Sequence, residues 1–521
     1  MKKISLVFYS IILTFIAHSQ SFEWVKTHLP NYNLNPEMIN TAVASDNAEN
    51  AYFFGIADFH ITYGSISLGD LFIKKYNSEG SVQWAKSIMG DASVSGVICN
   101  NAGDMYLYGQ TKSELDFWGE YQLYYDENQL NLFLAKVSSS GALIWAKNMS
   151  IDYVNYHTFS VPTIYEEGII IGIGNWMNSL VLTFSPEGLL ADSLLQENVS
   201  HISSVELDND GNIYVSGSCS GLESKFGGQP FPTDLSYSNY IAKYNANSEA
   251  VWVKFIEDVT CESPRLKIDQ QGNIYMSGSL HMDSYFGDIH ANGPSWVYDF
   301  FLTKLDSNGN FLWLKEVPEV LSGDAGLGGI NYMDINENGN IVLCGLTRKT
   351  VQWEENIVSN VEGNSTDIII LEYDQNGEIQ YAKTAGGEFY DRAKSISSTV
   401  NGNLYIAGTV AKTAYFDTIS VQSDEYAYPF IAKLNNQNIT SINSNTLENK
   451  LRIYPNPASD FIKIEGSTNS LFDVVDIYGK VVKQINGNAE HIDVYDLNSG
   501  IYFVVNKQDN GNNNYLKFIK K

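Results

Sequence analysis

Four aspartates occupy equivalent places in a sequence repeat, and carboxylates placed in this way could do chemistry. Each lies where one copy of the repeat ends and the next begins; they are Asp91, Asp258, Asp324 and Asp391. Two carboxylates about 5–9 Å apart in a cleft could cleave a glycosidic bond. A ring of carboxylates could instead bind a cation or a basic group. The spacing along the chain pairs no two of them, so solvated loop acids are the simpler interpretation.

Aromatic residues offer a second kind of site. They gather in long, variable connections inside the repeat, such as TKSELDFWGEYQLYYDENQLN and SLHMDSYFGDIHANGPSWVYD. Loops of this kind on a rigid scaffold often carry binding residues. Part of each connection could form an extra hairpin that tucks some rings into packing. The predicted ligand-binding aromatics are Trp118, Tyr124, Tyr125, Trp296, Tyr298, Tyr426 and Tyr428.

Other reactive motifs lack the context that their chemistry needs. GSCSG around Cys219 resembles a nucleophile elbow, but it ends a predicted strand with no helix after it. ELDNDG from Glu206 resembles the start of a calcium loop, but its twelfth position is Gly217 instead of a bidentate glutamate. We therefore predict no catalytic residue, no metal ligand and no cofactor, and leave open a structural cation at the channel mouth.

The four cysteines are too few for a disulfide framework, and none form a C-x-x-C pair. Cys219 and Cys261 could pair after export, and the sequence leaves this open. The remaining cysteines are Cys99 and Cys344.

The elements that must position these residues recur in three signatures: a pattern like DNDGNIYVSG, a strand like YIAKYN, and a strand like AVWVKF. Alternating apolar residues rich in β-branched and aromatic types predict strands, joined by tight Asn/Asp-Gly turns. Antiparallel units of four strands, repeating about every 45–68 residues, favour a β-propeller over a solenoid of shorter, parallel repeats. The strand anchors are Trp24, Trp84, Trp145, Trp252 and Trp313, with Ala191 and Tyr381 in weaker copies. We expect these tryptophans to pack between blades.

The repeat resembles the secreted β-propeller repeat families of Bacteroidetes-type bacteria, whose units look like GNIYVSG…FG…DxFLxKxDxNGxxxWxK. The resemblance covers residues 22–437. It implies the fold and says little about activity, because propellers host many functions. The prediction is an all-β chain with a seven-bladed β-propeller over this range.

The first strand, FEWVK, has no partner strand before it, and the last copy lacks its tryptophan strand. The two deficits match. We therefore predict that residues 22–26 form the outer strand of the final blade, beside residues 429–434, and close the ring.

A polar linker over residues 438–449 leads to a run of short strands at 450–521, predicted to form a small Ig-like β-sandwich. This tail resembles the C-terminal sorting domain of the type IX (Por) secretion system. The resemblance implies passage through the inner membrane by Sec, and then recognition of the tail by an outer-membrane translocon. An ordinary Ig-like accessory domain is the alternative. The motif residues are Tyr454, Pro455, Asn456, Pro457, Gly479, Gly500 and Tyr502.

Residues 1–20 look like a secretory signal peptide, with Lys2 and Lys3 before an apolar stretch too short to span a membrane. No later segment is apolar enough to be a transmembrane segment. The predicted location is secreted or on the outer-membrane surface.

The net charge is −28, and residues 450–521 carry 9 basic against 8 acidic side chains, so residues 22–449 hold nearly all the negative charge. Such a field serves solubility, repels nucleic acid and anionic membranes, and favours a neutral or cationic partner.

We expect a non-enzymatic surface or released protein that binds an unknown glycan or protein ligand through its loop face. The alternative is a glycan-active hydrolase or lyase that uses carboxylates at the channel mouth. A purely structural surface component is a third interpretation.

Overall fold

The computed structural model describes residues 20–28, 39–57, 61–63, 66–128, 130–152, 155–219, 223–231, 238–257, 263–281, 283–293, 299–318, 323–361, 365–422, 427–435, 452–465, 471–476, 480–486, 492–506 and 514–521. The predicted signal peptide up to residue 19 and the predicted linker lie outside these ranges. So do Asp258, Cys261, Trp296, Tyr298, Tyr426 and Gly479.

The chain divides into an N-terminal unit, Met1–Asn438, which contains the repeat units, and a C-terminal unit, Ile439–Lys521. Within the described residues the one helix is α1 (Met149–Asp152), a single turn. All other regular structure is strand, so the predicted all-β class is confirmed. No helix among the described residues is long and apolar enough to cross a membrane.

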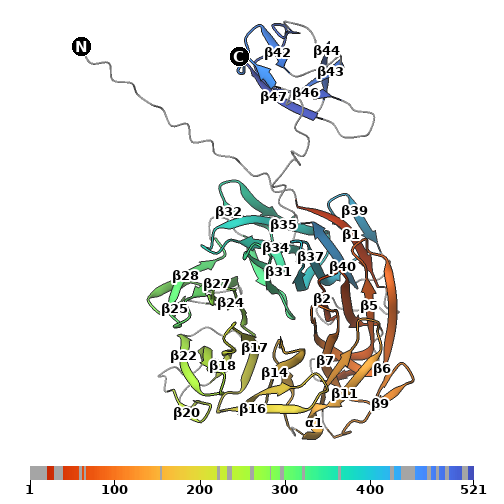
Figure 1. Ribbon diagram of the computed structural model, residues 1–521, viewed down its shortest axis with the longest axis vertical. Coiled ribbons are helices and arrows are strands. Elements are labelled where there is room, and N and C mark those ends of the chain that lie inside the picture. Colours follow the sequence, from red (N-terminus) through yellow and green to blue (C-terminus); the bar gives the residue numbers. More distant parts are fainter. Residues whose placement is uncertain are drawn as a thin grey trace, which may run out of the picture. The chain divides into compact units, whose positions relative to one another are not determined.

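The repeat folds as an antiparallel sheet whose strands follow chain order. In the fourth unit the order is β17 (His201–Leu207), β18 (Ile213–Cys219), β21 (Ser238–Tyr244) and β22 (Ala250–Glu257). The fifth unit repeats it with β23 (Arg265–Ile268), β24 (Ile274–Leu280), β27 (Asp299–Leu305) and β28 (Phe311–Glu316). Figure 1 shows such sheets arranged around a common centre, as the blades of a β-propeller.

The first two units share one long strand, which makes a single extended sheet. The strand β6 (Val82–Cys99) ends the first unit and begins the second. The other strands of the first unit are β2 (Thr41–Ser45), β3 (Ala51–Ile56) and β5 (Ile66–Tyr76), of which β5 pairs with β6. The other strands of the second are β7 (Met105–Thr111), β10 (Asn131–Val137) and β11 (Leu143–Asn148), of which β7 pairs with β6.

The third and sixth units keep the same order but have a divided first strand. The third contains β12 (Thr158–Phe159), β13 (Thr163–Tyr165), β14 (Gly168–Gly174), β15 (Ser179–Phe184) and β16 (Leu190–Glu197). The sixth contains β29 (Asp324–Leu327), β30 (Met333–Ile335), β31 (Ile341–Arg348), β34 (Asp367–Tyr373) and β35 (Ile379–Gly387).

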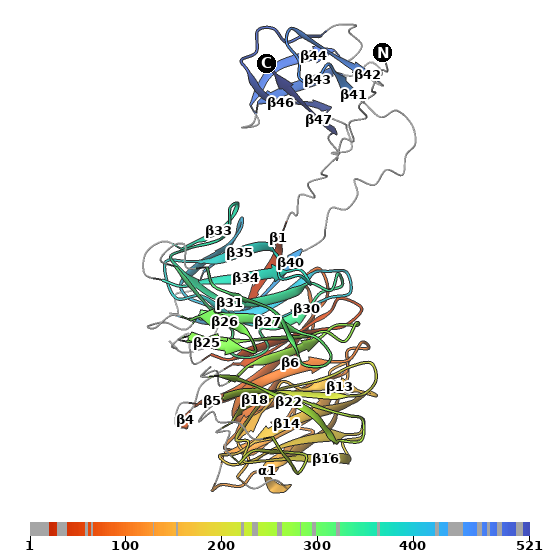
Figure 2. The same cartoon turned by 90° about the vertical axis from the view of Figure 1, so that its left-hand side faces the viewer.

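The last unit takes its outer strand from the start of the chain. Its sheet runs β36 (Arg392–Ser398), β37 (Leu404–Val410), β40 (Tyr428–Asn435) and β1 (Ser21–Thr27). The strands β1 and β40 pair antiparallel, with Trp24 opposite Lys433 and Thr27 opposite Phe430, and they lie side by side in both views (Figure 1, Figure 2). The predicted pairing of residues 22–26 with 429–434 is confirmed.

Successive antiparallel strands give each unit two distinct ends. The first-to-second and third-to-fourth turns lie at one end, which we call the turn end. The second-to-third and fourth-to-first connections lie at the other, the loop end. At the turn end Asp208 Oδ1 accepts the main-chain N–H groups of Asp210 and Asn212, while Oδ2 accepts Asn212 Nδ2 and the Tyr214 hydroxyl. These bonds explain the repeated D-x-x-G-N-x-Y pattern.

Each repeat tryptophan docks on a turn of the next unit. Trp84 Nε1 donates to the Ser139 carbonyl at 3.1 Å, and Trp145 Nε1 donates to the Pro186 carbonyl at 3.0 Å. Trp24 makes the same bond to Ser78, at 2.9 Å, and so joins the last unit to the first. The tryptophans therefore pack between blades, as predicted.

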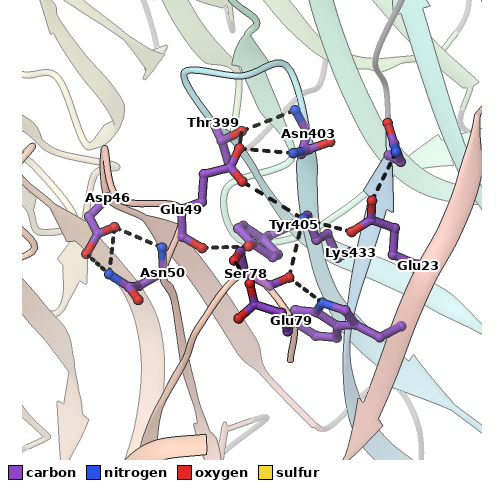
Figure 3. A network of polar contacts seen from close by, with 12 residues as sticks. Glu23, Asp46, Glu49, Asn50, Ser78, Glu79, Thr399, Asn403, Tyr405 and Lys433 are labelled. Carbon is purple, nitrogen blue, oxygen red and sulfur yellow. Dashed lines mark hydrogen bonds and ion pairs between the residues drawn. The ribbon is translucent and has the colours of Figure 1, made fainter. Parts of the chain in front are cut away.

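Polar contacts reinforce this seam between the last and first units (Figure 3). The Glu49 carboxylate accepts Thr399 Oγ1 and Asn403 Nδ2, at 3.1 and 3.0 Å. Lys433 Nζ lies 2.8 Å from a Glu23 carboxylate oxygen, which links β40 to β1 by charge as well as by register.

The long connections form extra hairpins that pack between blades. They are β8 (Leu115–Phe117) with β9 (Tyr121–Leu123), β19 (Lys225–Phe226) with β20 (Gln229–Pro230), β25 (Asp283–Phe286) with β26 (Ile289–Asn292), β32 (Thr350–Glu354) with β33 (Ile357–Asn360), and β38 (Thr413–Phe416) with β39 (Ile419–Gln422). A short β4 (Ile61–Tyr63) pairs with β5. Three hairpins pair with the outer strand of the preceding unit. Each of the five carries one buried aromatic: Phe117, Phe226, Phe286, Trp353 and Phe416.

The C-terminal unit consists of two sheets. One contains β41 (Arg452–Tyr454), β42 (Phe461–Glu465) and β45 (Ile492–Asp493). The other runs β44 (Val481–Asn486), β43 (Leu471–Asp476), β46 (Gly500–Asn506) and β47 (Asn514–Lys520). Their facing residues, including Ile462, Val474, Val504 and Phe518, form one buried core.

Candidate functional site

The predicted loop-end aromatics divide into exposed and packed residues. Tyr124 is exposed and Tyr125 is half-buried beside it, with ring centroids 6.4 Å apart. Trp118 is half-buried on the β8–β9 hairpin, with Lys86 Nζ 4.2 Å from its ring centroid. Tyr428 is fully buried in β40 and donates its hydroxyl to the Lys412 carbonyl. The expected exposure of Tyr428 is wrong, because the extra hairpins cover the strand starts where it lies.

The three predicted carboxylates that lie within the described residues do not form an open ring. Asp91 is half-buried in the middle of β6, and Asp324 lies 3.4 Å from Arg348 at the start of β29. Asp391 is fully buried, and its two oxygens accept the main-chain N–H groups of Ala411 and Gly387, at 2.7 and 2.8 Å. Asp391 therefore cannot line a channel mouth, contrary to the expectation.

Asp391 has a carboxylate neighbour that the sequence did not suggest. A Cβ added to Gly386 would lie 2.6 Å from Asp367 Oδ1 and 2.9 Å from Asp391 Oδ2. One oxygen of each carboxylate therefore lies close to the Gly386 backbone. Burial raises the pKa of Asp391 to about 8, with the Asp367 charge acting in the same direction. Burial also raises the pKa of Asp367 to about 7. The pair can hold a proton near neutral pH, but the burial of Asp391 keeps a polymer substrate away.

Trp176 is a loop-end aromatic that the sequence analysis missed. It stands in the tight turn between β14 and β15 and is 78% exposed, and the adjacent Met177 is 64% exposed. The His157 ring lies against it, with centroids 4.8 Å apart and planes 33° apart. The available signal was the tryptophan in the short GNWMNS turn, where the other units have long connections.

The turn around Trp176 is held by its own hydrogen bonds. Asn175 Oδ1 accepts the N–H groups of Met177 and Asn178, at 2.8 and 2.6 Å. His157 N donates to the Gly174 carbonyl, and Gln110 Nε2 donates to the His157 carbonyl. One face of the Trp176 ring is thus occupied by a fixed His157, and the ring is presented without a long loop.

The second repeat unit, next to the repeat unit that carries Trp176, contains a small depression. It has a volume of about 240 Å³ and is lined by residues that include Tyr121, Tyr124, Lys147 and Asn148. Asn148 Nδ2 donates to the Tyr124 carbonyl at 2.9 Å, which fixes the loop end of this unit. Aromatic and amide groups therefore occur together at the loop ends of the second and third units.

A larger cavity lies at the turn end. Its volume is about 570 Å³, and first-to-second turns of five units line it. The lining is polar and includes three carboxylates, Asp46, Asp269 and Glu337. Asp46 and Asp269 accept bonds within their own turns, whereas Glu337 is exposed. Asn336, also in the lining, has a buried Nδ2 without a hydrogen-bond partner.

The part of the chain that the structure describes contains no group of three or more histidine, cysteine, aspartate or glutamate residues that could hold a metal ion. Cys99, Cys219 and Cys344 are free thiols. Burial raises the pKa of Cys344, so this thiol is unreactive at neutral pH. Cys219 is fully buried, which does not suit a nucleophile.

The sorting-motif residues of the C-terminal unit help to build its fold. Asn456 Oδ1 accepts the Ile519 N–H and its Nδ2 donates to the Lys517 carbonyl, which ties the YPNP segment to β47. Tyr502 is buried in β46, stacks on Phe518 and donates to the Asn498 carbonyl. Gly500 begins β46, and Pro455 and Pro457 are exposed beside Asn456.

Residues 452–521 match the family described as a secretion system C-terminal sorting domain. This unit therefore marks a protein that the type IX system exports to the cell surface or the medium. No curated protein sequence matches this chain.

Several solved structures are similar to this chain, at low sequence identity and low TM-score. PorZ, a surface component of the type IX secretion system of Porphyromonas gingivalis, is 12% identical, with 93% of this chain and 70% of that chain covered and a TM-score of 0.29. The Dos1 propeller is 10% identical, with 80% of this chain and 95% of that chain covered and a TM-score of 0.38.

An enzyme is also among the similar structures, which corrects the expectation of a non-enzymatic chain. A gluconolactonase from Xanthomonas campestris is 11% identical, with 64% of this chain and 90% of that chain covered and a TM-score of 0.29. Strand arrangements of this kind occur in enzymes as well as in binding proteins, so the fold gives no ground for excluding catalysis.

Proposed function

We propose that this exported propeller binds a neutral glycan through the loop ends of its second and third repeat units. The observation that carries the proposal is Trp176, a large ring that is 78% exposed yet held in a fixed turn. His157 covers one ring face and leaves the other for a ligand. Exposed aromatic surface beside a few amide groups is the usual composition of a small-molecule site.

Charge supports a neutral ligand. The chain carries −28 overall, so an anionic polymer would be repelled at long range. A neutral polysaccharide experiences no such repulsion, and its C–H faces can pack on Trp176 and Tyr124. A protein with a basic surface is the competing ligand.

Binding to neutral polysaccharides, measured by affinity electrophoresis and a glycan array with the full chain, tests the proposal. We expect Trp176→Ala to lower affinity at least tenfold, since it removes the stacking surface. Stability should change by less than about 0.5 kcal/mol, because the side chain is exposed. Tyr415→Ala is the matched control: Tyr415 is also an exposed aromatic, but it lies on the β38–β39 hairpin of the last unit. Equal binding by Trp176→Ala and the parent, or binding to proteins alone, contradicts the proposal.

We also propose that the ring has seven blades. The support is a count of the repeat units described above. Six of them lie between β2 and β35, with β6 shared by the first two, and β36, β37, β40 and β1 form the seventh. Pairing of β1 with β40 then closes the ring and leaves no open seam.

A hydrolase or lyase is the second candidate function, favoured by the turn-end cavity. Three carboxylates from three units line it, and Glu337 is exposed there and free to act as a general acid or base. Release of reducing ends from polysaccharides would be measured for the parent and for Glu337→Gln. Activity that Glu337→Gln abolishes supports this candidate, and absence of activity in the parent removes it.

A further inference from the structure

The C-terminal unit has a sheet face with exposed apolar side chains, opposite its core. In the four-stranded sheet, Phe472, Val474, Val504 and Phe518 point into the core between the two sheets. Alternate residues of a strand point to opposite faces. A sheet with one solvated face normally carries polar residues there.

Here five of the outward positions are apolar instead, although Asp473 and Gln484 also lie on this face. Val481 is 45% exposed, Ile501 39% and Ile519 40%. Val475 and Phe503 are half-buried at the centre of the same face. We call these five residues the outer apolar face.

Strand register makes the outer apolar face one continuous patch. Val475 is opposite Val481 on β44 and opposite Phe503 on β46. Ile501 is opposite Ile519 on β47. Directly opposed residues in a sheet are side-chain neighbours, so the patch crosses all four strands. Contiguous exposed apolar surface of this kind marks an interaction site.

Two of the residues that the sequence motifs single out are engaged in holding the fold. Tyr502 is buried, and the Asn456 side chain is bonded to the main chain of β47. Both residues hold the fold together, so they do not account for an apolar sheet face.

Two exposed lysines border the face, while the Asp473 carboxylate on the same side of the sheet is buried and accepts a hydrogen bond from Gln484. Lys517 is exposed and directly opposite Phe503, and Lys480 is exposed next to Val481. Residues 450–521 carry 9 basic against 8 acidic side chains, while the rest of the chain is strongly acidic. An apolar centre with cationic neighbours fits an apolar protein surface bordered by carboxylates.

We infer that the outer apolar face is the surface on which a protein of the secretion machinery docks. The unit matches a sorting domain, so its surface must carry the recognition, and five positions of this face are apolar where a solvated sheet face would be polar. The inference does not depend on the proposed glycan binding.

The test is export of the full chain in its own bacterium, followed by immunoblots of the surface, medium and periplasmic fractions. We expect Ile501→Thr with Ile519→Thr to lower the exported fraction at least fivefold. Threonine keeps strand propensity while removing apolar surface. Lys517→Glu should also lower export, and it leaves the core untouched.

The control is Phe461→Thr with Tyr495→Thr. Phe461 is 41% exposed on β42 of the other sheet, and Tyr495 is exposed outside the four-stranded sheet. This variant should be exported like the parent. Deletion of residues 452–521 should abolish export, and its normal export would refute the sorting-domain assignment itself.

Protease resistance and thermal unfolding of each purified full chain separate docking from folding. If the threonine pair unfolds the unit, Lys517→Glu alone decides. Normal export of a folded face variant, or equal loss in the control, overturns the inference. So does a changed protease resistance of the first unit in the face variant, because the face would then contact the propeller.

Discussion

At the scale of single residues, the Asp367 and Asp391 pair couples protonation to stability. Asp391 accepts two main-chain N–H groups, which favour its charged form, whereas Asp367 Oδ1 is buried without a hydrogen-bond partner. Their folded pKa values, raised to about 7 and about 8, lie above the unfolded value near 3.9. The folded state then binds more protons between about pH 4 and pH 8, so stability falls as pH rises through this window.

Asp367→Asn removes this ionisation and keeps the shape. We expect the variant to be more stable than the parent at pH 8, by about 1 kcal/mol, the scale of relieving one buried unsatisfied group. At pH 4.5 the difference should vanish, because the parent pair is then protonated. Urea unfolding of the two proteins across this pH range measures it. Asp210→Asn, at an exposed turn position, is the control and should follow the parent curve; a parallel offset of Asp367→Asn at all pH values would contradict the coupling.

At the scale of elements, the repeat tryptophans and the turn glycines of the next unit form one device. Gly80 and Gly272 both have left-handed backbones, with φ of +74° and +78°. A Cβ on Gly80 would lie 2.7 Å from the Trp24 ring, whereas nothing lies within 4 Å of one on Gly272. Where Ala191 replaces the tryptophan, the following turn carries Ser248 at φ 62° instead of glycine.

This difference predicts unequal costs for the same substitution. Gly272→Ala should lose only the backbone term, about 1 kcal/mol. Gly80→Ala should lose about 2 kcal/mol more, since the new methyl group displaces Trp24 from the seam. Urea unfolding of the two variants gives both values. Equal losses would mean that the tryptophan moves aside without cost.

The extra hairpins show what a local pattern leaves undecided about an element. The sequence predicts that the long connections are binding loops, and that part of each could form an extra hairpin whose aromatic rings are packed. Phe117 and Phe416 are fully buried between blades, and Trp118 is half-buried beside Phe117. Whether such a ring is exposed depends on the outer strand of the preceding unit, about 30 residues away along the chain, which no local alternation of residues reveals.

At the scale of the whole molecule, the N-terminal strand and the C-terminal unit should contribute differently to propeller stability. Phe22, Trp24 and Val25 are buried against the last and first units. Deletion of residues 20–27 should therefore lower the unfolding midpoint of the propeller markedly, with loss of a buried strand worth several kcal/mol. Deletion of residues 452–521 should leave that midpoint unchanged, because the two units have separate cores. Calorimetry of both truncated chains tests this; an unchanged midpoint without residues 20–27 would contradict the role of β1.

The sequence by itself determined the all-β class, the order of strands within a unit, the type IX sorting unit and the partner of the first strand. These features follow from local periodicity, from turn chemistry, and from matching one unpaired strand to one missing strand. Only the tertiary structure decided that Asp391 is buried beside Asp367, that Tyr428 is covered and that Trp176 is exposed. Each of these depends on side chains from neighbouring units or connections, and burial is set by that packing rather than by the residue's own segment.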